Sequence, residues 1–319
     1  MEIDGVIGHE DVLSRIVPTL ESNGGTFLFH GPPSIGKRTV AFEVSRNILC
    51  NGGRVKGCVC ESCKKFGAGA HPDFMCVGQF GRIKVADVDS ILEYTLTAPF
   101  LSDRKVVVLD NAEVITWEAA NRLLKTLEEP PAGMFFFLVT SNPGTLLPTI
   151  YSRCVRVEFG HLSPTDVMNV LFQKMGYDMP KARVLGWLAS GSTIDIFSKA
   201  GQYLRYRDMA FEMLSQTRTR GLIDCLDYVD KIERDGLGIF ADMLVMILTD
   251  IMLVQNQITQ VTNVDLLDQI GKLAGQFNSK ALTVVVSILS QVKRDAALNI
   301  NLSMALKNAV IKTYPYLTA

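Results

Sequence analysis

Hydrophobic residues in the first half of the chain form short, nearly continuous runs separated by stretches with helical spacing. The runs are TFLFH at 26–30, DFMCV at 73–77, KVVVLD at 105–110, MFFFLVTS at 134–141 and VRVEF at 155–159. Such runs are typical of strands buried on both faces, as in a parallel sheet covered by helices. Helices are expected to begin after Gly36, near 85–87 and at 116–117. Residues 1–160 are therefore predicted to form an α/β domain with a parallel sheet.

The second half of the chain has no strand pattern and is predicted to be helical throughout. Three short helices are expected over 161–203, the first with Ser163 as N-cap and Pro164 at its first position. From 204 to 319, helical periodicity recurs over 205–217, 220–232, 236–257, 264–276, 280–296 and 300–314. A chain of 319 residues is too long for one ordinary core, so two or three domains are expected.

Composition narrows the possible functions. The net charge is −1, so the chain lacks the basic character that a DNA-binding domain acting alone usually has. Any DNA contact should be weak, local or shared with partners. No apolar run approaches the roughly 20 residues needed to cross a bilayer. The first residues, MEIDGVIGHEDV, lack the basic and apolar regions of a signal peptide. We expect a cytoplasmic protein without a membrane anchor.

The segment GPPSIGKRT at 31–39 resembles a phosphate-binding loop of the pattern G-x-x-x-x-G-K-[ST]. In that pattern the glycines expose backbone N–H groups to phosphate, the lysine adds charge and the final hydroxyl coordinates Mg²⁺. Here Arg38 replaces the hydroxyl, and a guanidinium has only donors, so it cannot bind a metal ion. Thr39 points about 100° away around the opening helix. The candidate nucleotide-binding residues of the loop are Gly31, Pro32, Ser34, Gly36, Lys37, Arg38 and Thr39.

A second motif, which contains an acidic residue, follows in VVVLDNAE at 106–113. Asp110 ends a predicted strand, where an acidic group can hold Mg²⁺ through water; the alternative is an aspartate that merely ends a buried strand. ATPases of the AAA+ class normally carry a glutamate next, which polarises the attacking water. Asn111 stands there instead, and an amide cannot act as a base at neutral pH.

Four of the seven cysteines, Cys50, Cys58, Cys60 and Cys63, lie close together in the sequence. In a cytosolic chain such a group is better explained by metal binding or by free thiols than by disulfides. Four thiolates can enclose a structural zinc ion tetrahedrally. The surrounding insert, about 50–64, is too small and glycine-rich for a core of its own, so a bound metal would supply its folding energy.

With LLPTIYSRC at 146–154, the chain resembles the clamp-loader subunits of bacterial DNA polymerase III, which belong to the AAA+ class. The resemblance covers essentially the whole length. It rests on VIGHEDV near the N-terminus, GPPSIGKRT, the cysteine group, HPD at 71–73, NRLLKTLEEPP at 121–131, TSNP at 140–143 and SRC at 152–154. It implies a RecA-like AAA+ domain over 1–160 with a zinc module, a small helical lid over 161–203 and an all-α collar for oligomerisation over 204–319.

The resemblance also implies a function. Such subunits form a pentameric ring, with gamma/tau and delta types, that opens a sliding clamp and closes it around primed DNA. The SRC motif implies that Arg153 is an arginine finger that reaches the ATP of a neighbouring subunit; a surface salt bridge is the alternative. Thr140 and Asn142 would lie in the sensor-one region. The zinc module is implied as well, although the family usually has C-x-x-C where this chain has Cys58-Val59-Cys60.

Three departures from a motor subunit indicate the non-motor, delta-prime type. They are Arg38 in the loop, Asn111 after the acidic residue and Ile194 where a motor subunit carries an arginine. Little hydrolysis is expected, while the retained glycines and Lys37 leave ATP binding open. Two alternatives are an ATP-hydrolysing gamma/tau-type motor of the same loader and a zinc-dependent DNA-binding adaptor on this scaffold.

Overall fold

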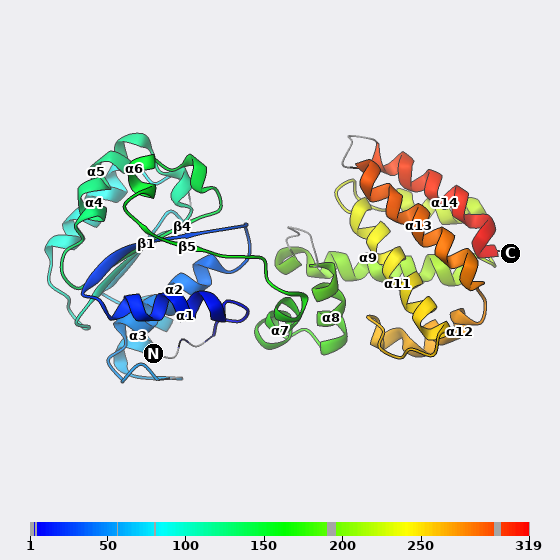
Figure 1. The fold of residues 1–319 in the computed structure, drawn as a ribbon, viewed down its shortest axis with the longest axis horizontal. Coiled ribbons are helices and arrows are strands. Elements are labelled where there is room, and N and C mark those ends of the chain that lie inside the picture. The colour runs from blue at the N-terminus through cyan, green and yellow to red at the C-terminus, as the bar shows by residue number, and fades with distance from the viewer. Residues whose placement is uncertain are drawn as a thin grey trace. The chain divides into compact units, whose positions relative to one another are not determined.

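The structure is a computed structural model that describes residues 3, 5–55, 57–79, 81–189, 196–296 and 301–318, with the backbone alone over 293–296. The chain divides into two compact units, Met1–Leu162 and Ser163–Ala319 (Figure 1). We describe each unit by itself. The finer division into a lid and a collar stays a prediction. Ile194 lies outside the described residues.

The first unit contains a five-stranded parallel sheet in the order β2-β3-β4-β1-β5. The strands are β1 (Gly24–His30), β2 (Phe74–Val77), β3 (Lys105–Leu109), β4 (Met134–Thr140) and β5 (Val155–Glu158). Each begins and ends within two residues of its predicted bounds. β3 and β4 are buried at every position, as continuous apolar runs require. The predicted α/β class with a parallel sheet is confirmed.

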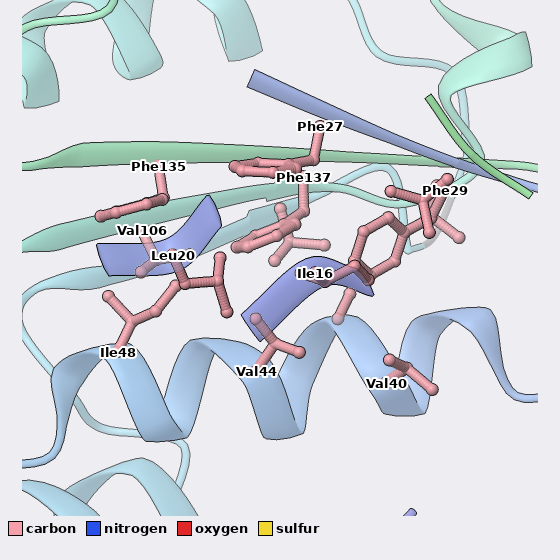
Figure 2. Packing of buried hydrophobic residues seen from close by; sticks show 14 of the residues in the cluster. Ile16, Leu20, Phe27, Phe29, Val40, Val44, Ile48, Val106, Phe135 and Phe137 are labelled. Atoms are coloured by element: carbon pink, nitrogen blue, oxygen red, sulfur yellow. The ribbon is translucent and has the colours of Figure 1, made fainter. Parts of the chain in front are cut away.

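Helices cover both faces of this sheet. They are α1 (Glu10–Ile16), α2 (Lys37–Leu49), α3 (Glu61–Gly67), α4 (Val85–Leu96), α5 (Trp117–Glu128) and α6 (Pro148–Tyr151). Because successive residues of a strand point to opposite faces, Phe135 and Phe137 pack in the cluster that contains α2, while Phe136 packs in the one that contains α4 and α5. Figure 2 shows the first cluster, with Val44 of α2 beneath the phenylalanines.

The second unit is helical at every regular element that the structure describes. Its helices are α7 (Pro164–Met175), α8 (Met179–Leu188), α9 (Ile196–Gln216), α10 (Leu222–Asp230), α11 (Leu237–Gln255), α12 (Leu267–Ala274), α13 (Ser279–Ala296) and α14 (Leu302–Thr318). Ser163 caps α7 and Pro164 holds its first position, as predicted. The expected boundary at 203/204 falls inside the continuous α9, because Gly201 alone does not interrupt a helix.

Helix α11 was not anticipated as one long apolar element. It has 19 residues and a mean hydropathy of 2.2, so it is long and apolar enough to cross a membrane. The expectation that no run approaches this length was wrong for this segment. Of its apolar stretch, 61% is buried inside the protein, which is typical of a core helix.

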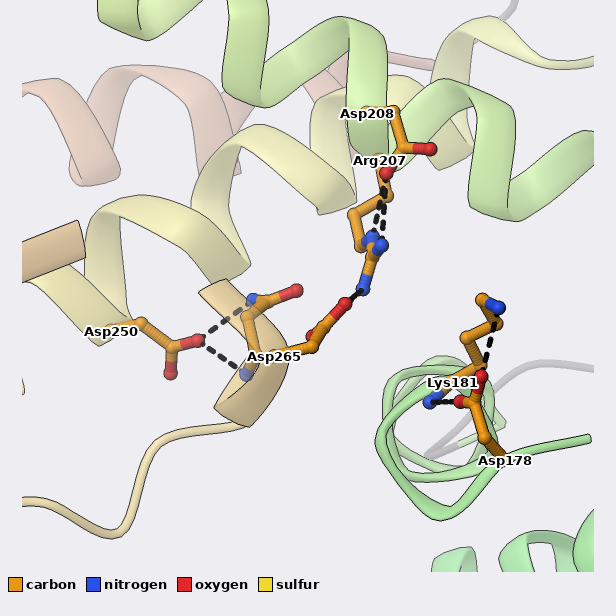
Figure 3. A network of polar contacts seen from close by, with 7 residues as sticks. Asp178, Lys181, Arg207, Asp208, Asp250 and Asp265 are labelled. Atoms are coloured by element: carbon orange, nitrogen blue, oxygen red, sulfur yellow. Dashed lines mark hydrogen bonds and ion pairs between the residues drawn. The ribbon is translucent and has the colours of Figure 1, made fainter. Parts of the chain in front are cut away.

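Buried polar groups connect the helices of this unit (Figure 3). Arg207 of α9 is 4% exposed and donates from Nη1 to the carboxylate of Asp265, at 2.8 Å from Oδ2. Asp250 of α11 accepts from the backbone N–H and the side-chain amide of Asn263, at 2.8 and 2.7 Å. Each buried charge therefore has partners, without which its burial would be costly.

Replacing Phe137 by alanine should lower the free energy of unfolding by about 3–5 kcal/mol, because it removes a fully buried ring. That ring lies with its centroid 5.3 Å from the ring of Phe27 and 5.2 Å from that of Phe29. Urea unfolding followed by circular dichroism measures the change. Phe100→Ala is the matched control, since its side chain is 82% exposed and should change the value by less than about 0.5 kcal/mol. Equal losses in the two variants would contradict this description of the core.

Candidate functional site

The loop between β1 and α2 has the backbone of a phosphate-binding loop. Three of its residues have positive φ angles: Gly31, Ser34 and Gly36. At Gly31 a Cβ atom would lie 2.3 Å from the carbonyl oxygen of Phe159, so no side chain fits there. The buried His9, from the N-terminal segment, has Nε2 2.7 Å from the carbonyl oxygen of Ile35. This contact fixes the far side of the loop.

Lys37 is turned back onto this loop. Lys37 is only 5% exposed. Its Nζ donates to the carbonyl oxygens of Gly31, at 2.8 Å, and Pro32. A third, longer contact reaches Ser141 Oγ at 3.3 Å. Burial lowers the pKa of Lys37, while Glu113 and Asp110 act in the opposite direction. A phosphate group would therefore compete with the loop's own carbonyls for this ammonium.

Arg38 and Asp110, the two residues at which the sequence motifs would place a metal ion, form an ion pair. Asp110 follows β3 and is 6% exposed, and its Oδ2 lies 3.4 Å from Arg38 Nε. The Arg38 guanidinium also lies over the ring of Phe42, 5.0 Å from its centroid. Burial raises the pKa of Asp110, and the positive charge of Arg38 opposes this shift. The exposed Thr39 occupies the next position of α2.

The position after Asp110, where a catalytic base is expected, is occupied by Asn111. Asn111 has a φ of 51° and donates from Nδ2 to the carbonyl oxygen of Gly78 at 3.4 Å. The exposed Asn142 donates its backbone N–H to the buried Thr140 Oγ1 at 3.0 Å, which caps the end of β4.

Sequence analysis missed one acidic residue of this site, Glu113. Its Oε1 accepts from the backbone N–H of Ser141 at 3.2 Å, beside the Lys37 contact. Its Oε2 is buried and has no hydrogen-bond partner among the described residues. The only signal in the sequence was its position three residues after Asp110, which alone does not distinguish it from a surface glutamate.

Arg153 lies at the end of α6 on the surface of the first unit. Its Nε is 2.9 Å from Oε2 of Glu128, the last residue of α5, and its Nη1 donates to the carbonyl oxygen of Thr149 at 3.1 Å. The side chains of Arg153 and Glu128 are 33% and 52% exposed. In the described part of the chain, Nη2 has no hydrogen-bond partner. The surface salt bridge considered as the alternative is thus present in the single chain.

The four predicted cysteine ligands come together at the start of α3. Their Sγ atoms all lie within 4.8 Å of one another, including 3.6 Å between Cys50 and Cys58. Zinc–sulfur bonds of about 2.3 Å in a tetrahedron require sulfur atoms about 3.8 Å apart, so the donor set fits a structural metal. Burial acts to raise the pKa of Cys60, but hydrogen bonds, led by the backbone N–H groups of Cys63 and Asn51, lower it to about 6.

A buried network anchors this module to the sheet. Ser62 of α3 donates to the carbonyl oxygen of Leu49 at 2.6 Å and lies 2.9 Å from His71 Nε2. Nδ1 of His71 accepts from the backbone N–H of Asp73 at 3.0 Å. The Asp73 carboxylate in turn accepts three backbone N–H bonds from residues 100–102, at 2.6, 2.7 and 2.8 Å. The HPD segment therefore connects the cysteine module to β2.

These features define a RecA-like P-loop domain in which an arginine pairs with the acidic residue that follows β3. Two family profiles match the chain: the one described as "DNA polymerase III, delta subunit" matches residues 9–163, and its "C terminal" counterpart matches residues 204–312. The chain therefore belongs to the delta-prime family of DNA polymerase III clamp-loader subunits, as the sequence resemblance indicated.

Individual relatives agree with this family. DNA polymerase III subunit delta' of Pseudomonas aeruginosa is 37% identical over 135 residues, 41% of each chain. Subunit tau of Salmonella typhimurium is 29% identical over 69% of this chain and 36% of its own length. Subunit delta' of Escherichia coli is 26% identical over 95% of this chain and 93% of its own. The matched segments thus span less than half of the first two relatives and nearly all of the third.

Gly31→Ala should destabilise the first unit by more than about 3 kcal/mol, because the added Cβ meets the Phe159 carbonyl at 2.3 Å and φ is +149°. Thermal unfolding of Gly31→Ala and of a control variant measures the loss of stability. Gly160→Ala is the control, since a Cβ there has nothing within 4 Å. A Gly31→Ala protein that unfolds at the same temperature as Gly160→Ala would show that the loop is not held as described.

Proposed function

We propose that this protein is a delta-prime-like subunit of the DNA polymerase III clamp loader, which helps to load the sliding clamp onto primed DNA. In this proposal the chain does not hydrolyse ATP itself and offers Arg153 to the ATP held by a neighbouring subunit. The observation that carries it is the ion pair between Arg38 and Asp110, with 3.4 Å between Nε and Oδ2. Family membership supports the role in clamp loading.

The deficiency in hydrolysis follows from what the site lacks. Arg38 takes the carboxylate that would otherwise help to hold Mg²⁺, and Asn111 offers an amide where a base is needed. Removing one such contact typically lowers the rate roughly 10²–10³-fold, and both replacements lower the expected rate of hydrolysis. The alternative of an ATP-hydrolysing motor subunit requires the Arg38–Asp110 pair to open in every cycle.

The proposed trans role of Arg153 is supported by its exposure and its unused donors. The Glu128 pair leaves Nη2 available, and an ion pair this exposed contributes only about 0–1 kcal/mol. A phosphate can therefore displace or join the carboxylate at little cost. A guanidinium supplied by a neighbour neutralises charge that develops on the γ-phosphate, which accelerates related reactions roughly 10³–10⁵-fold.

The proposed partners are gamma/tau-type and delta-type subunits in a pentameric ring. Relatives with delta-prime and tau names support this, as does a second unit that is helical in all its described elements. Residues 161–203 would act as the lid and 204–319 as the collar through which subunits assemble. Contact with the sliding clamp and primed DNA would be made by the assembled loader.

We also propose that the cysteine module binds one structural zinc ion. The ligands would be Cys50, Cys58, Cys60 and Cys63, whose Sγ atoms already lie within 4.8 Å of one another. A bound ion would hold the insert at 50–64, which has little core of its own. The metal would be structural, because four thiolates leave no open position for a substrate.

In a reconstituted loader, Arg153→Ala should reduce clamp-dependent ATP turnover by about 10³-fold or more, because the neighbour's γ-phosphate loses its cation. Steady-state phosphate release measures turnover, and size-exclusion chromatography checks that the ring still assembles. Arg153→Lys should remain impaired, since an ammonium lacks the planar fork of donors. Full turnover in Arg153→Ala, or ATP hydrolysis by the single chain that Lys37→Ala abolishes, would refute the proposal.

Purified protein should contain one zinc ion per chain by elemental analysis, because the four sulfur atoms match a tetrahedral site. Cys63→Ser should lose most of the metal and expose the remaining thiols to a thiol reagent. Cys154→Ser should keep it, since Cys154 is buried elsewhere in the first unit and is not in the group. Metal-free protein with four freely reacting thiols would be evidence against the zinc module.

A further inference from the structure

Arg38 does more than remove a metal ligand. We propose that its guanidinium is a built-in replacement for the divalent cation, so that this loop binds the polyphosphate chain of a nucleoside di- or triphosphate without Mg²⁺. The inference goes beyond the proposed function, which requires only that this site does not hydrolyse ATP. It rests on the position, partners and free donors of one side chain.

The position of Arg38 coincides with that of the missing metal. In a P-loop site the ion lies between the hydroxyl that follows the lysine and the acidic residue that ends a nearby strand. Arg38 is the residue that follows Lys37, and its Nε lies 3.4 Å from Asp110 Oδ2. A positive charge thus already stands beside the acidic residue. A divalent cation would have to displace it against electrostatic repulsion.

The remaining donors of Arg38 are available to a ligand. Nε lies 3.4 Å from Asp110 Oδ2 as a charge pair, and the two terminal nitrogens have no hydrogen bond within the described ranges of the chain. The side chain is 48% exposed, and the Phe42 ring beneath it, 5.0 Å from the guanidinium carbon, restricts its orientation. A guanidinium with two free terminal nitrogens matches two phosphate oxygens in a bidentate pair.

The loop supplies the rest of a binding site for a phosphate chain. Gly31, Ser34 and Gly36 have the positive φ angles that turn backbone N–H groups inward. Lys37 Nζ is buried beside this loop, bonded at present to the carbonyl oxygens of Gly31 and Pro32. Phosphate oxygens would exchange with these acceptors. The shared chemistry is therefore that of a di- or triphosphate, whether it belongs to a nucleotide or is inorganic.

Calorimetric titration of the full chain with ATP, ADP and inorganic tripolyphosphate tests this, each in EDTA and in excess Mg²⁺. The wild-type protein should bind in EDTA with an affinity within about threefold of that in Mg²⁺. Arg38→Thr should lose about 10–100-fold in EDTA, the usual effect of a lost charged hydrogen bond, and recover with Mg²⁺ through its new hydroxyl. Tighter binding of ATP than of tripolyphosphate would identify the ligand as a nucleotide, and equal binding would identify the bare polyphosphate chain.

Asp110→Asn separates this proposal from an ordinary metal-dependent site. In this protein the substitution removes a carboxylate that competes with phosphate for Arg38, so metal-free binding of the phosphate chain should be unchanged or tighter. In a magnesium site the same change removes a metal ligand and weakens binding. Lys37→Ala should abolish binding in both conditions, which locates the ligand in this loop.

Several results would overturn the inference. They are absence of wild-type binding in both conditions, wild-type binding that requires Mg²⁺, and undiminished metal-free binding by Arg38→Thr. Thermal unfolding checks that each variant is folded; if Arg38→Thr is not, Arg38→Lys should weaken metal-free binding to an intermediate value. None of these outcomes bears on the trans role of Arg153, which is measured on the neighbour's ATP.

Discussion

The ion pair between Arg38 and Asp110 is the interaction that gives this site its character. Parallel strands end at the same edge of a sheet, so the loop after β1 and the acidic residue after β3 meet there although β4 lies between the two strands. Asp110 is nearly buried, and a buried carboxylate without a cation is costly. Arg38 supplies a positive charge beside this carboxylate.

Much of the fold was predictable because its pattern is local. The runs at β3 and β4 are almost entirely apolar, which is typical of a strand covered on both faces, and Ser163 followed by Pro164 marks the start of α7. The extent of α9 was not predicted, because a boundary was expected at 203/204, inside the helix. The extent of α11 was predicted, but its apolar character was missed because acidic residues interrupt the run, although Asp250 is buried and bonded to Asn263.

Apart from Glu113, the residues that meet at the site could be named from the sequence, but their contacts could not. The loop, the acidic residue and the cysteines follow from spacing, but which partner Arg38 chooses depends on strand order, which spacing does not encode. The cysteine module shows the same limit. At Gly52 a Cβ atom would lie 2.4 Å from Cys58 Sγ, so a glycine lets the chain turn tightly enough for a C-x-C pair to join the group. The sequence shows that glycine without showing its purpose.

Two arginines of the first unit differ in how firmly their partners hold them. The side chain of Asp110 is 8% exposed, whereas that of Glu128 is 52% exposed, so the carboxylate of Asp110 lies in a lower dielectric and is screened less by water. The Arg38 pair is nevertheless the longer of the two, with 3.4 Å between Nε and Oδ2 against 2.9 Å between Arg153 Nε and Glu128 Oε2. Arg153 is held by a carboxylate that water already solvates, so exchanging it for a phosphate leaves no buried charge behind. In the two proposals, Arg38 serves a ligand of its own loop and Arg153 serves the ATP of a neighbouring subunit, and the burial of their acidic partners distinguishes the two sites.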